Sequence, residues 1–363
     1  MSYQAGPQGY PPYPQPPYQA PPPVPPDPRR QAQLAERRSV RRGSTLAGLT
    51  MLIGILLTFL LSAVLGFPLS SLDGKTIYEL FDTPLWDSAV SVLGTAALLS
   101  AALIGLRLLR PEERAGVLLF GRPCAGMRGR EISALAVIFA GGMFCVVGQY
   151  VSTYLGSFAE GIGVTFQGPP DSYPATLPEM IAAAVATAVF PAVTEEVLLR
   201  GVLLQPLRRQ LGDGPAVLLA ALLFALMHGN MVQAPLALVS GVALGYAVVL
   251  TGSLWPAILI HFFNNAGAVL SDVLHNRLPE SQLDLIFRGY DVAWFVLGGL
   301  GIGWLFANWR RYRPKQDGAA APRKPPRLNS RPLLSVHYLF GSVPMVLVIL
   351  YYLFWVIDTT QFR

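Results

Sequence analysis

Long apolar runs are the feature of this chain that most constrains how it can fold. One run, residues 45–67, contains no charged side chain, and only 13% of the 363 residues are charged, whereas soluble domains carry roughly 25%. About 20 apolar residues span the hydrocarbon core of a bilayer as a helix. We therefore expect an all-α fold, a polytopic transmembrane helix bundle of about eight or nine spans. The candidate spans are 45–67, 87–107, 131–156, 178–202, 214–230, 233–250, 254–274, 289–308 and 336–357.

The composition divides the chain into four parts. Residues 1–43 are rich in Pro and Tyr and then in Arg, which predicts a disordered cytoplasmic tail with a basic juxtamembrane segment. Residues 44–308 hold the bundle, and residues 309–335 form a basic cytoplasmic linker. Residues 336–357 predict an additional C-terminal transmembrane helix, which the sequence ties least to the rest.

The basic residues lie beside the apolar runs, which argues against a nucleic-acid partner although the pI is about 9.4. With the N-terminus inside, 22 of the 27 Lys and Arg residues fall on the cytoplasmic side. Cytoplasmic loops carry such an excess, so we expect an integral membrane protein whose N-terminus is cytoplasmic and whose partners include membrane lipids. The Pro-rich tail and the lack of a targeting signal indicate a bacterial inner membrane.

Ionisable residues inside a span are costly and usually functional, and the fourth span carries Glu195, Glu196 and Arg200 close together. Glu196 and Arg200 are four residues apart, so they can pair on one helix face. Glu195 points about 100° away and can face a neighbouring helix. Pro191 frees a backbone carbonyl and kinks the helix, which suits a polar cavity. The alternative is that both glutamates bind Arg200 near the cytoplasmic interface.

Two further spans carry imidazole groups. His228 ends the fifth span, and His261 lies one turn before Asn265 in the seventh, so His261 and Asn265 can point into one cavity. A lone intramembrane histidine is often only a packing residue. Together, however, carboxylates, imidazoles and an amide are the groups that hydrolysis needs, because they activate water and stabilise an oxyanion.

Three motifs follow one another on successive predicted spans: EExxxR (Glu195, Glu196, Arg200), FxxxH (Phe224, His228) and HxxxN (His261, Asn265). This ordered set resembles the CPBP family of intramembrane proteases, which includes the CAAX prenyl endopeptidases and bacteriocin-immunity relatives. The resemblance covers about residues 178–275 and departs from the family at Leu199, where an aromatic residue is usual.

The resemblance implies a role for each matching residue. Glu195 is expected to be the general base, and His228 to hold the attacking water. His261 and Asn265 are expected to stabilise the oxyanion. Glu196 would be a further site residue, and it would form a supporting ion pair with Arg200.

The resemblance also leaves a zinc-dependent variant open. Glu195, His228 and His261 are chemically suitable zinc ligands with an open fourth position. No HExxH helix is present, and Asn265 suits an oxyanion donor better, so a metal-free glutamate mechanism is favoured.

We therefore expect an endopeptidase that cleaves a peptide or protein substrate, including the prenylated CAAX class, near the cytoplasmic leaflet. A non-catalytic scaffold, immunity protein or transporter is the alternative, although no segment of the sequence repeats the motifs. The predicted spans also create a conflict of depth. Straight helices place Glu195 and His261 about 10 Å from the inner side and His228 about 20 Å from it.

Overall fold

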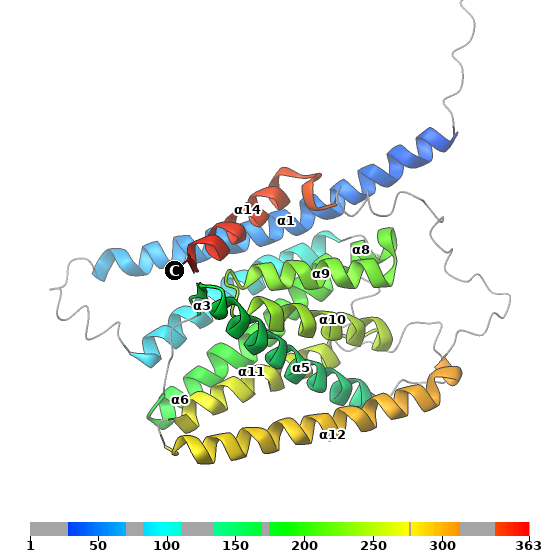
Figure 1. Cartoon of the computed structure of the whole chain (residues 1–363). Coiled ribbons are helices and arrows are strands. Elements are labelled where there is room, and N and C mark those ends of the chain that lie inside the picture. Colours follow the sequence, from blue (N-terminus) through cyan, green and yellow to red (C-terminus); the bar gives the residue numbers. More distant parts are fainter. Residues whose placement is uncertain are drawn as a thin grey trace, which may run out of the picture.

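The computed structural model describes residues 28–69, 83–109, 134–168, 174–275, 277–312 and 338–362. Helices dominate it (Figure 1). Those before the motif region are α1 (Pro28–Leu69), α3 (Pro84–Leu108) and α5 (Ala134–Gly161). Those after it are α9 (Asp213–Met227), α10 (Ala234–Thr251), α11 (Trp255–His275), α12 (Glu280–Tyr312) and α14 (Val343–Asp358).

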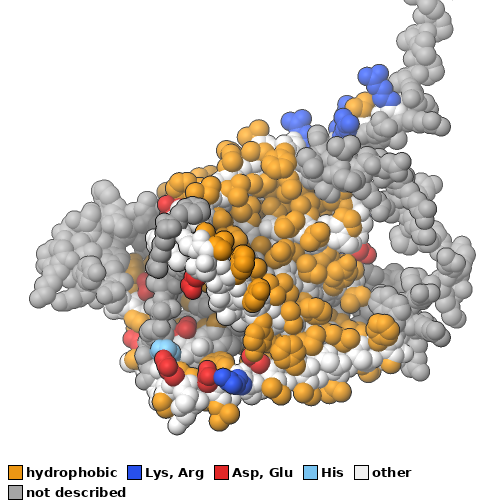
Figure 2. All heavy atoms as spheres, in the orientation of Figure 1, with side chains coloured by type: hydrophobic (Ala, Val, Ile, Leu, Met, Phe, Trp, Pro, Cys, Tyr) orange, Lys and Arg blue, Asp and Glu red, His pale blue; other side chains and the backbone are white. Residues whose placement is uncertain are grey.

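The predicted helical membrane bundle is confirmed, and each of the nine predicted spans overlaps a helix. In the described part of the chain, seven helices are long and apolar enough to cross a membrane. The helices Asp213–Met227 and Val343–Asp358 are apolar but shorter. Large apolar side chains also cover much of the outer surface in Figure 2. The chain is therefore an integral membrane protein.

The disorder predicted for residues 1–43 is wrong from residue 28 onward, because α1 begins at Pro28. Proline suits the first turn of a helix, and the Arg, Gln, Ala, Leu and Glu residues that follow are strong helix formers. The part of the predicted tail from 1 to 27 lies outside the described residues. Most of the predicted basic linker 309–335 does so as well, since α12 ends at Tyr312.

The fourth predicted span ends too early at residue 202, because the helical path continues from Leu177 to Leu211. It comprises α6 (Leu177–Ala183), the π-helix η2 (Ala184–Val189), α7 (Phe190–Glu196), the π-helix η3 (Val197–Leu203) and α8 (Leu204–Leu211). Gly212, with φ of 85°, then turns the chain into α9.

This longer helix removes the conflict of depth. Glu195 lies about 24 Å before the turn at Gly212 and His228 about 22 Å after it, at 1.5 Å per residue. The two motifs therefore reach similar depths on neighbouring antiparallel elements.

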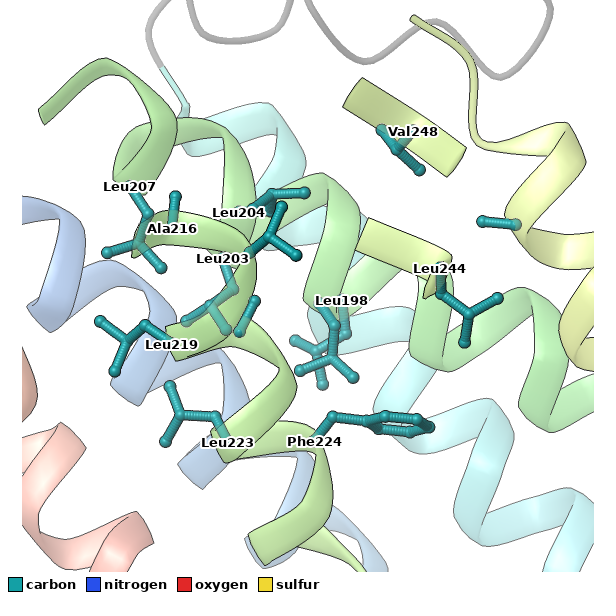
Figure 3. Close-up of a cluster of buried hydrophobic side chains, with 14 of the residues drawn as sticks. Leu198, Leu203, Leu204, Leu207, Ala216, Leu219, Leu223, Phe224, Leu244 and Val248 are labelled. Atoms are coloured by element: carbon teal, nitrogen blue, oxygen red, sulfur yellow. The ribbon is translucent and has the colours of Figure 1, made fainter. Parts of the chain in front are cut away.

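Buried apolar side chains of η3, α8, α9 and α10 pack together in one cluster of the core (Figure 3). Small residues allow the close approach: a Cβ on Gly241 would lie 3.0 Å from the Ala221 Cβ, and one on Gly245 would lie 2.8 Å from a Val217 methyl. The GxxxG spacing in α10 therefore forms the close-packing face that such spacing indicates.

The C-terminal helix α14 is an integral part of the bundle rather than an appendage. It runs beside α1 (Figure 1), and the Ser44 and Ser342 hydroxyls are hydrogen-bonded at 2.8 Å. After α14, β2 (Thr360–Phe362) pairs antiparallel with β1 (Val164–Phe166). The sequence alone misses these contacts because they join segments almost 200 residues apart or more.

We expect Gly48→Ala to destabilise the α1–α14 contact. A Cβ at this position would lie 2.4 Å from the Met345 backbone nitrogen, so the whole of α14 must shift. Such overpacking costs about 1–3 kcal/mol, measurable as a lower midpoint of thermal unfolding in detergent. Gly303→Ala is the matched control, because a Cβ there meets nothing within 4 Å. Equal midpoints for both variants would contradict the packing described.

Candidate functional site

The di-glutamate segment lies between two π-helical stretches. The residue after η2 donates its backbone N–H to Val185 O, and the residue after η3 donates to Leu199 O, each five residues back. Such π-bulges are rare and occur frequently at functional sites. Their effect here is to change the direction in which side chains leave the helix on either side of Glu195 and Glu196.

Glu196 and Arg200 form the buried ion pair that their spacing predicts. The Arg200 Nη1–Glu196 Oε1 distance is 2.7 Å, and the side chains are 1% and 0% exposed. Arg200 Nη2 also donates to the Gly241 carbonyl at 3.2 Å, and its guanidinium carbon lies 4.7 Å from the centre of the Phe224 ring. A buried pair needs such additional partners to offset desolvation. The alternative of a pair that reaches the aqueous interface does not match this burial.

His261 connects the two glutamates. Its Nδ1 lies 3.0 Å from Glu196 Oε1, and its Nε2 lies 3.8 Å from Glu195 Oε2. An ionised carboxylate only accepts hydrogen bonds, so with Glu196 ionised the proton is on Nδ1 and Nε2 faces Glu195. Glu196 thus fixes the ring orientation, as acidic partners of functional histidines commonly do.

Glu195 is the less constrained carboxylate. Its side chain is 23% exposed, and its buried Oε2 accepts no hydrogen bond from any described residue. The 3.8 Å to His261 is longer than a direct hydrogen bond. A carboxylate with unused lone pairs beside an oriented imidazole is suited to accept a proton.

Among the described residues, the His228 ring is linked to His261 through the Phe224 ring that lies between them. The His228 and Phe224 rings are 4.9 Å apart between centroids, and Phe224 and His261 are 5.7 Å apart, both edge to face. His228 Nδ1 is hydrogen-bonded to the Phe224 carbonyl at 2.9 Å. No hydrogen bond or ion pair joins His228 to either glutamate among the described residues.

Asn265 is held by the freed carbonyl that Pro191 predicts. Thr187 lies four residues before Pro191, and its carbonyl accepts a hydrogen bond from Asn265 Nδ2 at 2.9 Å. The Asn264 amide donates to Asn265 Oδ1 at 3.1 Å. One N–H of the Asn265 amide is thereby used, and the amide group has two.

Two contacts of the site escape sequence reasoning. The Gln205 amide, which is buried, donates to the Arg200 carbonyl at 2.8 Å. The Gly241 carbonyl accepts from the Arg200 guanidinium. A five-residue spacing does not indicate a partner in a regular α-helix, and a backbone carbonyl carries no sequence signal at all.

The donors predicted for zinc do not come together as a set. Among the described residues, no group of three or more His, Cys, Asp and Glu side chains is placed to hold a metal ion. His261 faces Glu195, but its other nitrogen and Glu196 are already paired, and His228 has one ring nitrogen on its own helix. The residues as arranged do not fit a three-ligand site.

Comparison with known proteins agrees with the motifs. Residues 177–267 match the family described as "Type II CAAX prenyl endopeptidase Rce1-like". Over this segment the chain is similar to the CAAX-type intramembrane proteases. The match covers about a quarter of the chain and confirms the predicted resemblance to CPBP proteases. No curated protein and no solved structure matches the chain.

We expect Arg200→Met to lower the free energy of unfolding by about 3–5 kcal/mol, because it leaves the Glu196 charge buried without its partner. Replacing Glu196 by Met as well should recover a large part of this loss. Chemical denaturation in detergent measures both. Arg288→Ala breaks a second i,i+4 pair, with Asp284, that is 76% and 70% exposed, and should change little. If Arg200→Met is no less stable than this control, the buried pair does not contribute to the free energy of unfolding.

Proposed function

We propose that this chain is an intramembrane endopeptidase that uses water activated by Glu195. The observation that supports this most strongly is the asymmetry between the two glutamates. Glu196 is fully buried and binds Arg200 and His261 through Oε1, whereas Glu195 is 23% exposed and makes no hydrogen bond to a described residue. The match to a protease family over the same residues supports the same conclusion.

In the proposed reaction, Glu195 removes a proton from water while the water oxygen attacks the peptide carbonyl carbon. His228 would hold this water through the ring nitrogen that is not bonded to the Phe224 carbonyl. The tetrahedral intermediate carries a negative oxygen, which positioned N–H donors stabilise. On collapse the C–N bond breaks, and the proton held by Glu195 passes to the leaving amine.

The proposed oxyanion donors are His261 and Asn265. Asn265 retains one N–H beyond its bond to the Thr187 carbonyl. A His261 ring that carries both protons donates Nδ1–H to Glu196 and can present Nε2–H to the intermediate. Glu196 and Arg200 serve this step as the pair that holds the ring in place.

The proposed substrate is a peptide or protein of the CAAX class, prenylated at its cysteine, that is cleaved near the cytoplasmic leaflet. The family match supports this substrate class, and the distribution of Lys and Arg supports a cytoplasmic N-terminus in the proposed bacterial inner membrane. Inside-out vesicles should then cleave added substrate and right-side-out vesicles should not.

We expect Glu195→Gln to reduce kcat by at least about 10²-fold, since general base catalysis contributes typically 10²–10⁴. A quenched fluorescent peptide that ends in a farnesylated CAAX sequence, cleaved by protein in vesicles, gives the rate. Glu280→Gln, a carboxylate at the exposed start of α12, is the matched control and should retain wild-type kcat. Full cleavage by the Glu195 variant would remove this residue from the mechanism.

Chelation separates the glutamate mechanism from the zinc alternative. We expect cleavage to continue unchanged after prolonged dialysis against a strong chelator, because no step proposed above uses a metal. Elemental analysis of the dialysed protein provides the control for complete removal. Activity that disappears with the chelator and returns with added zinc would overturn the metal-free mechanism.

A further inference from the structure

The C-terminal helix α14 contacts the backbone directly after His228. Gly229 has φ of 64°, a conformation that glycine adopts at no steric cost. A Cβ on Gly229 would lie only 3.1 Å from the Trp355 Cβ. The Thr359 hydroxyl donates to the Gly229 carbonyl at 3.3 Å. It shares this hydrogen with the carbonyls of Trp355 and Val356. The end of α14 thus packs on the His228 loop.

This end of α14 is itself fixed by the small β-sheet. The Gln167 N–H donates to the Thr359 carbonyl at 2.8 Å, and Thr360 then pairs with Phe166 as the ladder begins. Thr359 therefore lies between a packed helix and a paired strand. Because Thr359 is fixed on both sides, its contact with Gly229 restrains the position of the loop after His228.

The same face of α14 also lines a groove. Tyr352 lies one turn before Trp355 on this face. Tyr352 and Trp355 line a groove of about 480 Å³ between α1, α3 and α14. A hydroxyl of Ser91, in the same groove, reaches the Ala186 carbonyl at 3.5 Å. The face of α14 that packs on the His228 loop therefore also faces a groove whose Ser91 contacts η2, part of the helical path that carries Glu195.

On its other side the loop is held by its own polar side chains. The Asn230 amide donates to the His228 carbonyl at 2.8 Å and to Gln233 Oε1 at 2.9 Å. The Gln233 N–H returns a bond to Asn230 Oδ1 at 2.9 Å. These bonds fix the conformation of the loop itself. Its position relative to Glu195 depends on the elements that pack on it.

We infer that α14 and β2 complete the proposed catalytic site, with Trp355 and Thr359 as positioning residues that hold Gly229 and thereby aim the His228 ring. This inference rests on the proposed function and concerns a segment outside the family match at 177–267. Misplacement of a catalytic group by about 1 Å can cost on the order of 10²-fold in rate. Contacts that fix a loop backbone are therefore sufficient to control the reaction.

The decisive test compares two glycines that share a positive φ. Gly229→Ala introduces both backbone strain and the Trp355 contact, whereas Gly212→Ala, at φ of 85°, meets nothing within 4 Å. We expect Gly229→Ala to lower kcat about 10- to 100-fold with KM within about twofold. Gly212→Ala should lose comparable stability and keep kcat within about threefold. Equal kcat values for the two variants would overturn the inference.

A second pair of variants avoids backbone strain. Thr359→Val keeps the shape and removes the hydroxyl, whereas Thr359→Ser restores a hydroxyl. We expect the Val variant to lower kcat about 3- to 10-fold, as the loss of one weak shared hydrogen bond implies, and the Ser variant to return to the wild-type rate. Leu350→Ala, on the exposed face of α14, is the control and should leave kcat unchanged. A Val variant with the wild-type rate would remove Thr359 from the role.

A readout without catalysis separates this inference from the proposed function. The chain has four histidines, so ring signals in ¹⁵N-histidine NMR can be assigned from a His228→Gln variant. Gly229→Ala and Thr359→Val should shift the His228 ring signal and leave that of His261 in place. If the wild-type protein cleaves no substrate but these shifts occur, the proposed function fails and the positioning role stands. Unchanged His228 signals would refute the positioning role itself.

Discussion

The arrangement of the site depends on the buried Glu196 carboxylate. A charge without solvent contact is stable only when partners surround it, and Glu196 takes these from Arg200 and from the His261 ring. Arg200 in turn needs the Gly241 carbonyl and the Phe224 ring face. This chain of requirements joins the helical path Leu177–Leu211 to α9, α10 and α11, so the electrostatics of one carboxylate fix the packing of the four elements around it.

Adjacent glutamates acquire different roles from this arrangement. A helix sends neighbouring side chains about 100° apart, and only Glu196 lies on the face that Arg200 and His261 can satisfy together. Glu195 is left with an oriented imidazole nitrogen at 3.8 Å, a side chain that is 23% exposed and no hydrogen bond to a described residue. The same local geometry thus separates a structural carboxylate from one that is suited to take up a proton.

Elements outside the family match at residues 177–267 pack against residues inside it. The sheet β1–β2 ties the end of α14 to the loop after α5, and α14 packs on Gly229 beside His228. Trp355 and Thr359, which lie outside the family match, therefore contact Gly229 inside it. Differences in such outer helices offer one way in which proteins with the same motifs can differ in rate or in substrate.

The sequence by itself determined the helical membrane bundle, because unbroken apolar runs leave the backbone no other way to satisfy its hydrogen bonds in a bilayer. It also determined the Glu196–Arg200 pair, since i,i+4 geometry is local, and the carbonyl freed by Pro191. Only the tertiary structure decided that the fourth helical segment continues to Leu211, that Asn265 is the residue that binds that carbonyl, and that α14 packs beside His228. These outcomes depend on contacts between residues far apart in the chain, where neither spacing nor hydropathy carries a signal.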